Sequence, residues 1–343
     1  MTLKFTSFLF AIAVLFSCSS DDATTIAPVT QTPLITLEFT TPPIAVESTG
    51  AQFAADIPYD QYDKTTFDIF LPPSTDPTGL VIFIHGGGFT GGGKSFIYSN
   101  NYETEVIDLL GNGIAVATIN YRLLVDGDTD GVLKCLNDSK RALQYIRYIH
   151  NELNIDKDKI VLFGSSAGAS TSLWLAANDE LRDLNSVDPV LQESTRVKGI
   201  ALNATQSSLD IETRWLGDVF EEFEVTLDDI IGEFGEDRVF SFYGINSLAA
   251  YDTPEIDAYR QQVDMLGMLT SDDPEIWVKN TGTQNSAPMT TGSFNHHPFH
   301  AREIKAFADA AGVPTVATYG NPILYSDPSN ESYVDFLMRK LNE

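Results

Sequence analysis

A serine stands at the centre of the stretch Gly164-Ser165-Ser166-Ala167-Gly168, directly after the apolar run at 160–163. The β-branched and aromatic residues of that run predict a strand, and the residues at 169–177 are compatible with a helix. A sharp strand-to-helix turn places its central side chain at the tip, and glycines permit the strained backbone that such a turn needs. We therefore expect Ser166 to expose its hydroxyl as a nucleophile. The alternative is a glycine-rich turn with an incidental serine.

A second glycine-rich segment, His85-Gly86-Gly87-Gly88, follows the apolar run at 80–84. Consecutive glycines let backbone N–H groups point into a cavity without a side chain in the way, as a developing oxyanion requires. We expect Gly87 and Gly88 to form an oxyanion hole together with the N–H of Ala167. The segment lacks both the Gly-Lys-Ser/Thr ending and the G-x-G-x-x-G spacing of phosphate-binding loops. His85 is expected to brace this loop.

The elements that must position these motifs alternate between apolar strands and amphipathic helices. This rhythm predicts a mostly parallel sheet with right-handed crossovers and with helices on both faces, an α/β fold. Predicted strands lie at 65–72, 80–84, 113–119, 160–163, 197–202, 276–280 and 314–319, and predicted helices at 103–110, 138–153, 169–177, 301–312 and 331–341.

The segment from about 211 to 273 interrupts this alternation. It is acidic, contains many aromatic residues and has helical rather than strand patterning. We interpret it as a helical cap inserted over the edge of the sheet, where loops and insertions commonly set substrate specificity. An additional helical layer without a gating role is the alternative.

Composition excludes some classes of partner. The net charge is -27, and only 21 residues are lysine or arginine. Nucleic-acid binding needs clustered basic residues for phosphate contacts, so we expect no nucleic-acid partner. No motif calls for a cofactor.

The first residues have the pattern of an export signal. Lys4 precedes the apolar stretch at 8–16, which is too short to span a bilayer. The sequence Leu15-Phe16-Ser17-Cys18 resembles the lipobox of bacterial lipoproteins, which implies removal of 1–17 and acylation of Cys18. We expect a flexible tether at 18–45, a domain at 46–343, a membrane contact through the lipid anchor, and a location at the outer membrane or cell surface. An ordinary secretory signal with a stray cysteine is the alternative.

The motifs together resemble the α/β-hydrolase superfamily. The similarity rests on 68–72, 85–89, 120–123, Asp138 and the turn at 164–168, and it is closest to carboxylesterases that carry a His-Gly-Gly-Gly motif, including hormone-sensitive-lipase-like, feruloyl and acetyl esterases. The resemblance covers most of residues 60–205 closely and the last 70 residues only in outline. It implies the α/β-hydrolase fold and a serine carboxylesterase activity, and it leaves the ester unspecified.

The sequence departs from this family at the catalytic histidine. Members carry the triad acid after the strand that here ends near Asn280, and the triad histidine after the last strand. No histidine follows Tyr319 in this chain. Instead, Asp327 lies in the loop where the histidine is expected, and three of the five histidines cluster at 296–300.

We expect the base to come from this cluster, because a triad is defined by geometry and not by chain order. We choose His297, because Pro298 fixes the loop at that point. His300 is expected to lie already on the next helix. We expect Asp327 to orient this histidine, with Asp210 as the alternative. The candidates for the base are His296, His297 and His300.

Two other interpretations of the cluster remain open. The first is that the cluster binds a metal, because His297 and His300 are one helical turn apart. No carboxylate or cysteine stands at ligand spacing nearby, so we predict no metal site. Alternatively, the histidines are structural and the chain is a catalytically degenerate hydrolase-fold lipoprotein that binds esters or glycans. We expect a serine carboxylic-ester hydrolase acting on small-molecule or glycan esters.

Overall fold

The computed structural model of the protein describes residues 34–99 and 101–343. The expected signal at 1–17 and Cys18 lie outside the described residues. A single nine-stranded sheet with strand order β1-β2-β4-β3-β5-β6-β7-β8-β9 organises the described part. Its strands are β1 (Gln52–Pro58), β2 (Thr66–Leu71), β3 (Thr78–Ile84), β4 (Ala115–Ile119), β5 (Ile155–Ser165), β6 (Gly199–Asn203), β7 (Glu275–Asn280), β8 (Thr315–Gly320) and β9 (Ile323–Ser326).

The six strands from β3 to β8 run parallel to one another, and only β1, β2 and β9 pair in antiparallel fashion. The predicted mostly parallel sheet is therefore confirmed. The sequence did not predict the edge strands β1 and β9. Parallel strands bring their carboxyl ends to one edge of the sheet, so the segments that follow β3, β5, β6 and β7 meet there.

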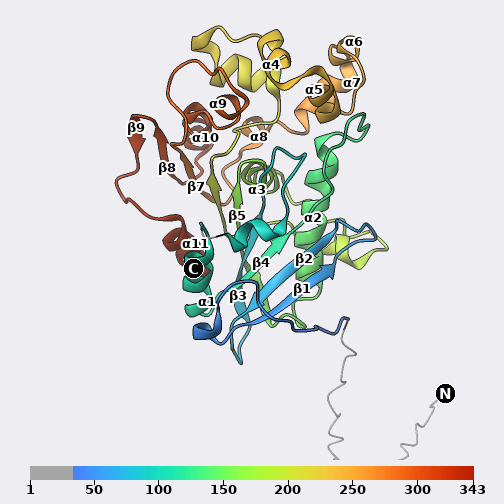
Figure 1. Ribbon diagram of the computed structural model, residues 1–343, viewed down its shortest axis with the longest axis vertical. Coiled ribbons are helices and arrows are strands. Elements are labelled where there is room, and N and C mark those ends of the chain that lie inside the picture. The colour runs from blue at the N-terminus through green and yellow to red at the C-terminus, as the bar shows by residue number, and fades with distance from the viewer. Residues whose placement is uncertain (1–33, 100) are drawn as a thin grey trace, which may run out of the picture. The chain divides into compact units, whose positions relative to one another are not determined.

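Helices cover both faces of the sheet, as predicted (Figure 1). The face carrying Val81, Phe83, Val161 and Phe163 packs against α1 and α11. The opposite face, with Leu80, Ile82 and Leu162, packs against α2, α3 and α10. The bounds are α1 (Glu103–Gly111), α2 (Val132–Tyr148), α3 (Ala167–Ala177), α9 (Thr291–Asn295), α10 (Pro298–Ala311) and α11 (Tyr333–Asn342), with short helices η1 (Glu47–Thr49), η2 (Lys94–Tyr98) and η3 (Pro189–Gln192).

A group of helices connects β6 to β7. Helices α4, α5, α6 and α7 lie together beyond the carboxyl ends of the central strands (Figure 1). They share a separate apolar core that includes Trp215, Phe220 and Tyr243 and also takes in Phe294 and Phe299. The bounds are η4 (Ile211–Val219), η5 (Glu221–Phe223), α4 (Leu227–Phe234), α5 (Glu236–Tyr243), α6 (Leu248–Tyr251), α7 (Pro254–Gln261) and α8 (Met265–Met268).

The residues that lead into β1 lie against the sheet. Phe39 forms an isolated bridge with Ala54, and the side chain of Ile44 is buried. This segment is the end of the stretch that we expected to be a tether. Among the described residues, none of the helices combines the length and hydropathy needed to cross a membrane.

Candidate active site

Ser166 occupies the turn between β5 and α3. Its backbone has φ 53° and ψ -123°, a conformation that a residue with a side chain rarely adopts. A hydrogen bond of 2.9 Å from the Ser166 N–H to the carbonyl of Asn203 helps to hold this turn. Helix α3 begins at the next residue, so the serine lies above the positive end of a helix. The structure thus places Ser166 at a strained turn at the carboxyl end of the sheet.

Glycines make this turn possible because other chain segments pass very close to it. A Cβ atom at Gly164 would overlap the backbone of Gly168, and one at Gly168 would overlap the carbonyl of Ile84. At Gly86 an added Cβ would lie 3.0 Å from the Cβ of Ser166. The glycines therefore allow the turn to pack directly against the end of β3 and the loop that follows it.

His296 is the histidine that contacts the serine. Its Nε2 lies 2.8 Å from the Ser166 Oγ. His296 directly follows α9 as its C-cap residue, and its carbonyl accepts a hydrogen bond of 2.9 Å from the Thr283 hydroxyl. Burial lowers the pKa of His296 below its usual value of 6.5, which favours the neutral ring. A neutral Nε2 at this distance can accept the serine proton.

Gln206 connects the serine and histidine segments, a role that the sequence did not suggest. Its side chain is buried, and Oε1 accepts a hydrogen bond of 2.6 Å from Ser170 on α3. Its Nε2 donates to the carbonyl of Asn295 at 2.7 Å, one residue before His296. Gln206 follows β6 by three residues. Its position just after a central strand was the one feature of the sequence that could have indicated a place near the site.

The expectation that His297 is the base is wrong in its geometry. The ring is fully buried, with Nδ1 accepting from the N–H of Phe299 at 3.2 Å and Nε2 donating to the carbonyl of Ser286 at 3.1 Å. Pro298 is the first residue of α10, so the residue before it caps that helix and its side chain turns toward the helix N-terminus. The proline that we used to select His297 is the reason it faces away from Ser166.

His300 is also directed elsewhere. It is fully buried, accepts a hydrogen bond of 3.2 Å from the N–H of Ser207 through Nδ1, and donates to the carbonyl of Phe294 at 2.9 Å. Burial lowers its pKa to about 3. His300 thus joins the loop after β6 to α9 as a neutral side chain.

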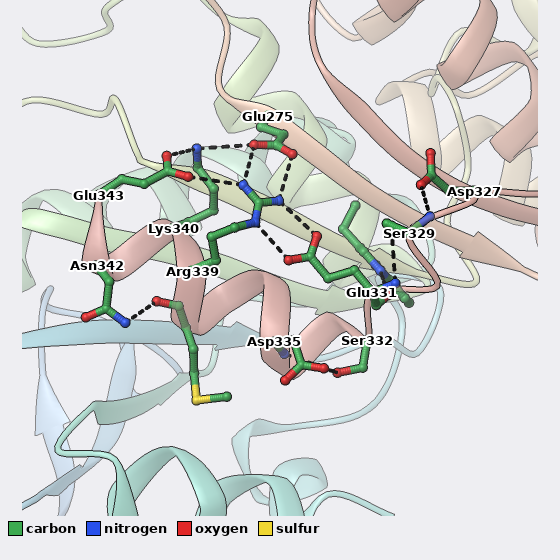
Figure 2. Close-up of polar contacts among 12 residues, drawn as sticks. Glu275, Asp327, Ser329, Glu331, Ser332, Asp335, Arg339, Lys340, Asn342 and Glu343 are labelled. Carbon is green, nitrogen blue, oxygen red and sulfur yellow. Dashed lines mark hydrogen bonds and ion pairs between the residues drawn. The ribbon is translucent and has the colours of Figure 1, made fainter.

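Neither expected acid reaches a histidine. Strand β9 runs back along β8, so the Asp327 N–H donates to the carbonyl of Ala317 at 2.9 Å, in the middle of β8. Its carboxylate accepts from the N–H of Ser329 at 2.9 Å, in the loop before α11 (Figure 2). The expectation for Asp327 failed because the sequence gave no sign of this added edge strand.

Asp210, the alternative acid, caps the N-terminus of η4. Its carboxylate accepts from the N–H of Thr213 at 3.1 Å and lies 3.8 Å from the guanidinium of Arg260. Across residues 34–99 and 101–343, no carboxylate forms a hydrogen bond or ion pair with His296. In the described residues, the serine and histidine form a dyad.

The glycine-rich loop lies beside the dyad. Its backbone N–H groups at Gly87 and Gly88 form no hydrogen bond with any described residue, and Ala167 is the first residue of α3, where an N–H has no intrahelical acceptor. His85 braces the loop, with its ring stacked on Tyr121 at a centroid distance of 4.3 Å and its Nδ1 donating to the Gly86 carbonyl at 2.7 Å. Three donors are therefore available for an oxyanion near Ser166.

A cavity of about 50 Å³ opens beside Ser166. That is several times the roughly 10–15 Å³ that one water molecule needs, so the cavity has room for a small substituent. Its wall combines residues near the dyad, the loop after β6 and the helices between β6 and β7. The lining residues are Gly88, Phe89, Ser166, Gln206, Leu209, Ile211, Trp215, Phe234, Arg238, Val239, Phe242 and Asn295.

The three clustered histidines do not converge on a common point. His296 contacts Ser166, His297 contacts Ser286, and His300 contacts Ser207 and Phe294. In the part of the chain that the structure describes, no three His, Cys, Asp or Glu side chains gather as a metal site.

Comparison with known proteins gives matches around the same motifs. The family model described as BD-FAE matches residues 67–213, less than half of the chain. Gut esterase 1 of Caenorhabditis elegans is 29% identical over 154 residues, which cover 43% of this chain and 26% of the relative. Lipase 2 of Geotrichum candidum is 28% identical over 121 residues, covering 31% of this chain and 21% of the relative. The chain therefore spans about a quarter or less of the length of these curated relatives.

Solved structures match over a larger share of the chain. A truncated carbohydrate esterase from gut microbiota has a TM-score of 0.59 at 17% identity, covering 85% of this chain and 96% of that chain. An esterase from Thermogutta terrifontis with bound butyrate has a TM-score of 0.51 at 18% identity, covering 84% and 90%. The chain therefore has the α/β-hydrolase fold, and the segment that carries its serine turn is similar to esterases.

Proposed function

We propose that the protein is a serine carboxylic-ester hydrolase. The observation that carries this proposal is the 2.8 Å contact between the Ser166 Oγ and the His296 Nε2 at a strained strand-to-helix turn. A nucleophile and a base within hydrogen-bonding distance are the minimum arrangement for nucleophilic catalysis by serine.

The geometry supports a two-step acyl transfer. The Ser166 Oγ attacks the ester carbonyl carbon while its proton moves to the His296 Nε2. The carbonyl oxygen becomes an oxyanion that accepts hydrogen bonds from the N–H groups of Gly87, Gly88 and Ala167. The tetrahedral intermediate collapses as His296 returns the proton to the leaving alcohol, and water then releases the acyl group by the same steps.

The substrate and location are also proposals. The structural neighbours include a carbohydrate esterase and an acetyl ester-xyloside bifunctional hydrolase, which supports a glycan ester as substrate. The lipobox-like sequence ending at Cys18 supports a lipid anchor that holds the domain at a bacterial outer membrane or cell surface.

One observation favours a second candidate, a degenerate hydrolase that binds esters without turning them over. In the described residues His296 has no carboxylate partner, and loss of the orienting acid lowers kcat about 10⁴-fold in well-studied triads. We therefore expect the dyad to be slow compared with a complete triad, but still dependent on both of its members.

Labelling and hydrolysis with matched variants test the proposal. We expect a fluorophosphonate probe to label the protein, and Ser166→Ala to abolish labelling and hydrolysis of p-nitrophenyl acetate. His296→Asn should lower kcat by at least about a hundredfold, because the general base is lost. His297→Asn is the matched control, since asparagine preserves a helix cap. Equal losses in the two histidine variants would contradict the assignment, and a wild-type protein that takes up no label would favour the binding protein.

A further inference from the structure

Arg238, on α5, lines the same cavity as Ser166. Its side chain forms no hydrogen bond or ion pair with any residue in 34–99 or 101–343. The guanidinium lies over the ring of Phe234, with 5.4 Å between the guanidinium carbon and the ring centroid. A guanidinium carries five N–H donors and stays charged, so a half-buried one without an acceptor is unusual.

Every other arginine of the chain has an oxygen partner. Arg147 donates to the backbone carbonyl of Arg196. The remaining arginines each contact a carboxylate: Arg122, Arg141, Arg182, Arg196, Arg214, Arg260, Arg302 and Arg339. The chain has 48 acidic residues, and Glu236 and Asp237 stand exposed on the same helix as Arg238 without contacting it. Among the ten arginines, Arg238 is therefore the one without an oxygen partner in the described residues, and a shortage of anions does not explain this.

The guanidinium also approaches the oxyanion loop. A Cβ atom at Gly88 would lie 2.5 Å from the Arg238 Nη2, so the glycine leaves the space that the guanidinium uses. The cation–π contact with Phe234 holds the charge toward the cavity without occupying its hydrogen-bond donors. Arg238 is thus positioned beside the reacting centre with its donors available.

The lining of the cavity places it next to Ser166 and the glycine-rich loop. His296 must return its proton to the leaving alcohol, so the alcohol lies on the side of His296. The cavity is lined by Ser166, Gly88 and Arg238, and on the side of the histidine segment by Asn295 but not by His296 itself. An acyl group bound to the Ser166 Oγ would therefore extend into the space that Arg238 faces.

We infer that Arg238 binds a carboxylate carried by the acyl group of the substrate, so that the preferred ester is that of an anionic, dicarboxylic-type acyl group. This inference rests on the proposed function. Arginine is suited to this role because its planar fork matches a carboxylate with two parallel hydrogen bonds. The apolar wall of the cavity, including Trp215 and Phe242, strengthens the interaction by excluding water.

A pair of esters tests this inference. Mono(p-nitrophenyl) glutarate is compared with an uncharged ester in which an isopropyl group replaces the carboxylate, and Ser166→Ala supplies the background rate for each. For Arg238→Met we expect kcat/KM to fall about tenfold or more on the glutarate ester, since a charge-assisted hydrogen bond is lost, and less than about threefold on the uncharged ester. Arg238→Lys should retain part of the preference.

The control is Arg182→Met, which removes the same charge from a surface residue paired with Glu180. This variant should leave kcat/KM unchanged on both esters. Equal losses on the two esters in Arg238→Met would show that Arg238 stabilises the oxyanion or the helix packing, and would overturn the inference. An unchanged glutarate rate would overturn it as well. Serine-dependent hydrolysis of the uncharged ester in either case would leave the proposed function standing.

Discussion

Gln206 should position His296 for catalysis, and Gln206→Met tests this role. The wild-type side chain is 4% exposed and joins Ser170 to the carbonyl of Asn295 by hydrogen bonds of 2.6 and 2.7 Å. Methionine has a similar length but neither donates nor accepts in this way. The substitution therefore removes the link between α3 and the segment that ends at His296.

The expected cost follows from the groups left without partners. The half-buried Asn295 carbonyl loses its side-chain donor, which costs roughly 1–2 kcal/mol, in the lower part of the range for a buried group. The Ser170 hydroxyl costs less, because it can turn to the carbonyl of Ser166, which already lies 3.4 Å away. We expect a total loss of about 2–3 kcal/mol in the free energy of unfolding, and a fall in kcat of roughly a hundredfold if His296 moves by about 1 Å.

A matched control separates positioning from stability. Gln144 is also fully buried, and its Nε2 donates to the carbonyls of Leu191 and Glu193 at 3.3 and 2.9 Å, against a helix remote from the dyad. Gln144→Met should also lower the free energy of unfolding, because two carbonyls lose their donor, and should leave kcat unchanged. Urea unfolding and steady-state hydrolysis of p-nitrophenyl acetate measure the two effects. Equal kcat values for the two variants would refute the positioning role, as would a change in KM alone.

Two predictions concern pH. Because burial lowers the pKa of His296 below 6.5 and no described carboxylate opposes this, kcat/KM should reach half its maximum below pH 6.5 and fall about tenfold per pH unit further down; a midpoint above pH 7 would indicate an acid partner. His300 has a folded pKa of about 3 against about 6.5 unfolded, so the unfolded chain binds the extra proton between these values. The free energy of unfolding should therefore fall by about 1.4 kcal/mol for each pH unit below 6.5. When this free energy is measured by urea unfolding at several pH values, its dependence on pH should be weaker for His300→Asn than for the wild type.

Local pattern was sufficient to predict the fold and the turn that carries Ser166. The run at 160–163 and the glycines around Ser166 predict a strand, a strained turn and a helix from neighbouring residues alone. The structure has β5 ending at Ser165 and α3 beginning at Ala167. The predicted oxyanion donors, Gly87 and Gly88, likewise depend on a local backbone property that glycine confers.

The partners of Ser166 depended on tertiary structure. Choosing among adjacent histidines requires knowing which way each ring turns, and the cap formed by His297 on α10 decided that in favour of His296. A feature visible in the sequence, Pro298 after a histidine, indicated a helix cap, but we used it as evidence for a rigid loop. The misplacement of Asp327 had a different cause, because an edge strand as short as β9 gives little periodic signal.

The sequence by itself therefore determined the α/β architecture, the serine turn and the glycine-rich loop, because each of these follows from residues adjacent in the chain. Only the tertiary structure decided that His296 reaches the serine, that Gln206 ties the two segments together, and that Arg238 faces the cavity without a partner among the described residues. These contacts join residues separated by dozens of positions, and their geometry is set by how the helices after β6 and β7 pack over the carboxyl edge of the sheet. Backbone direction and side-chain rotamer there are fixed by packing, which no local pattern encodes.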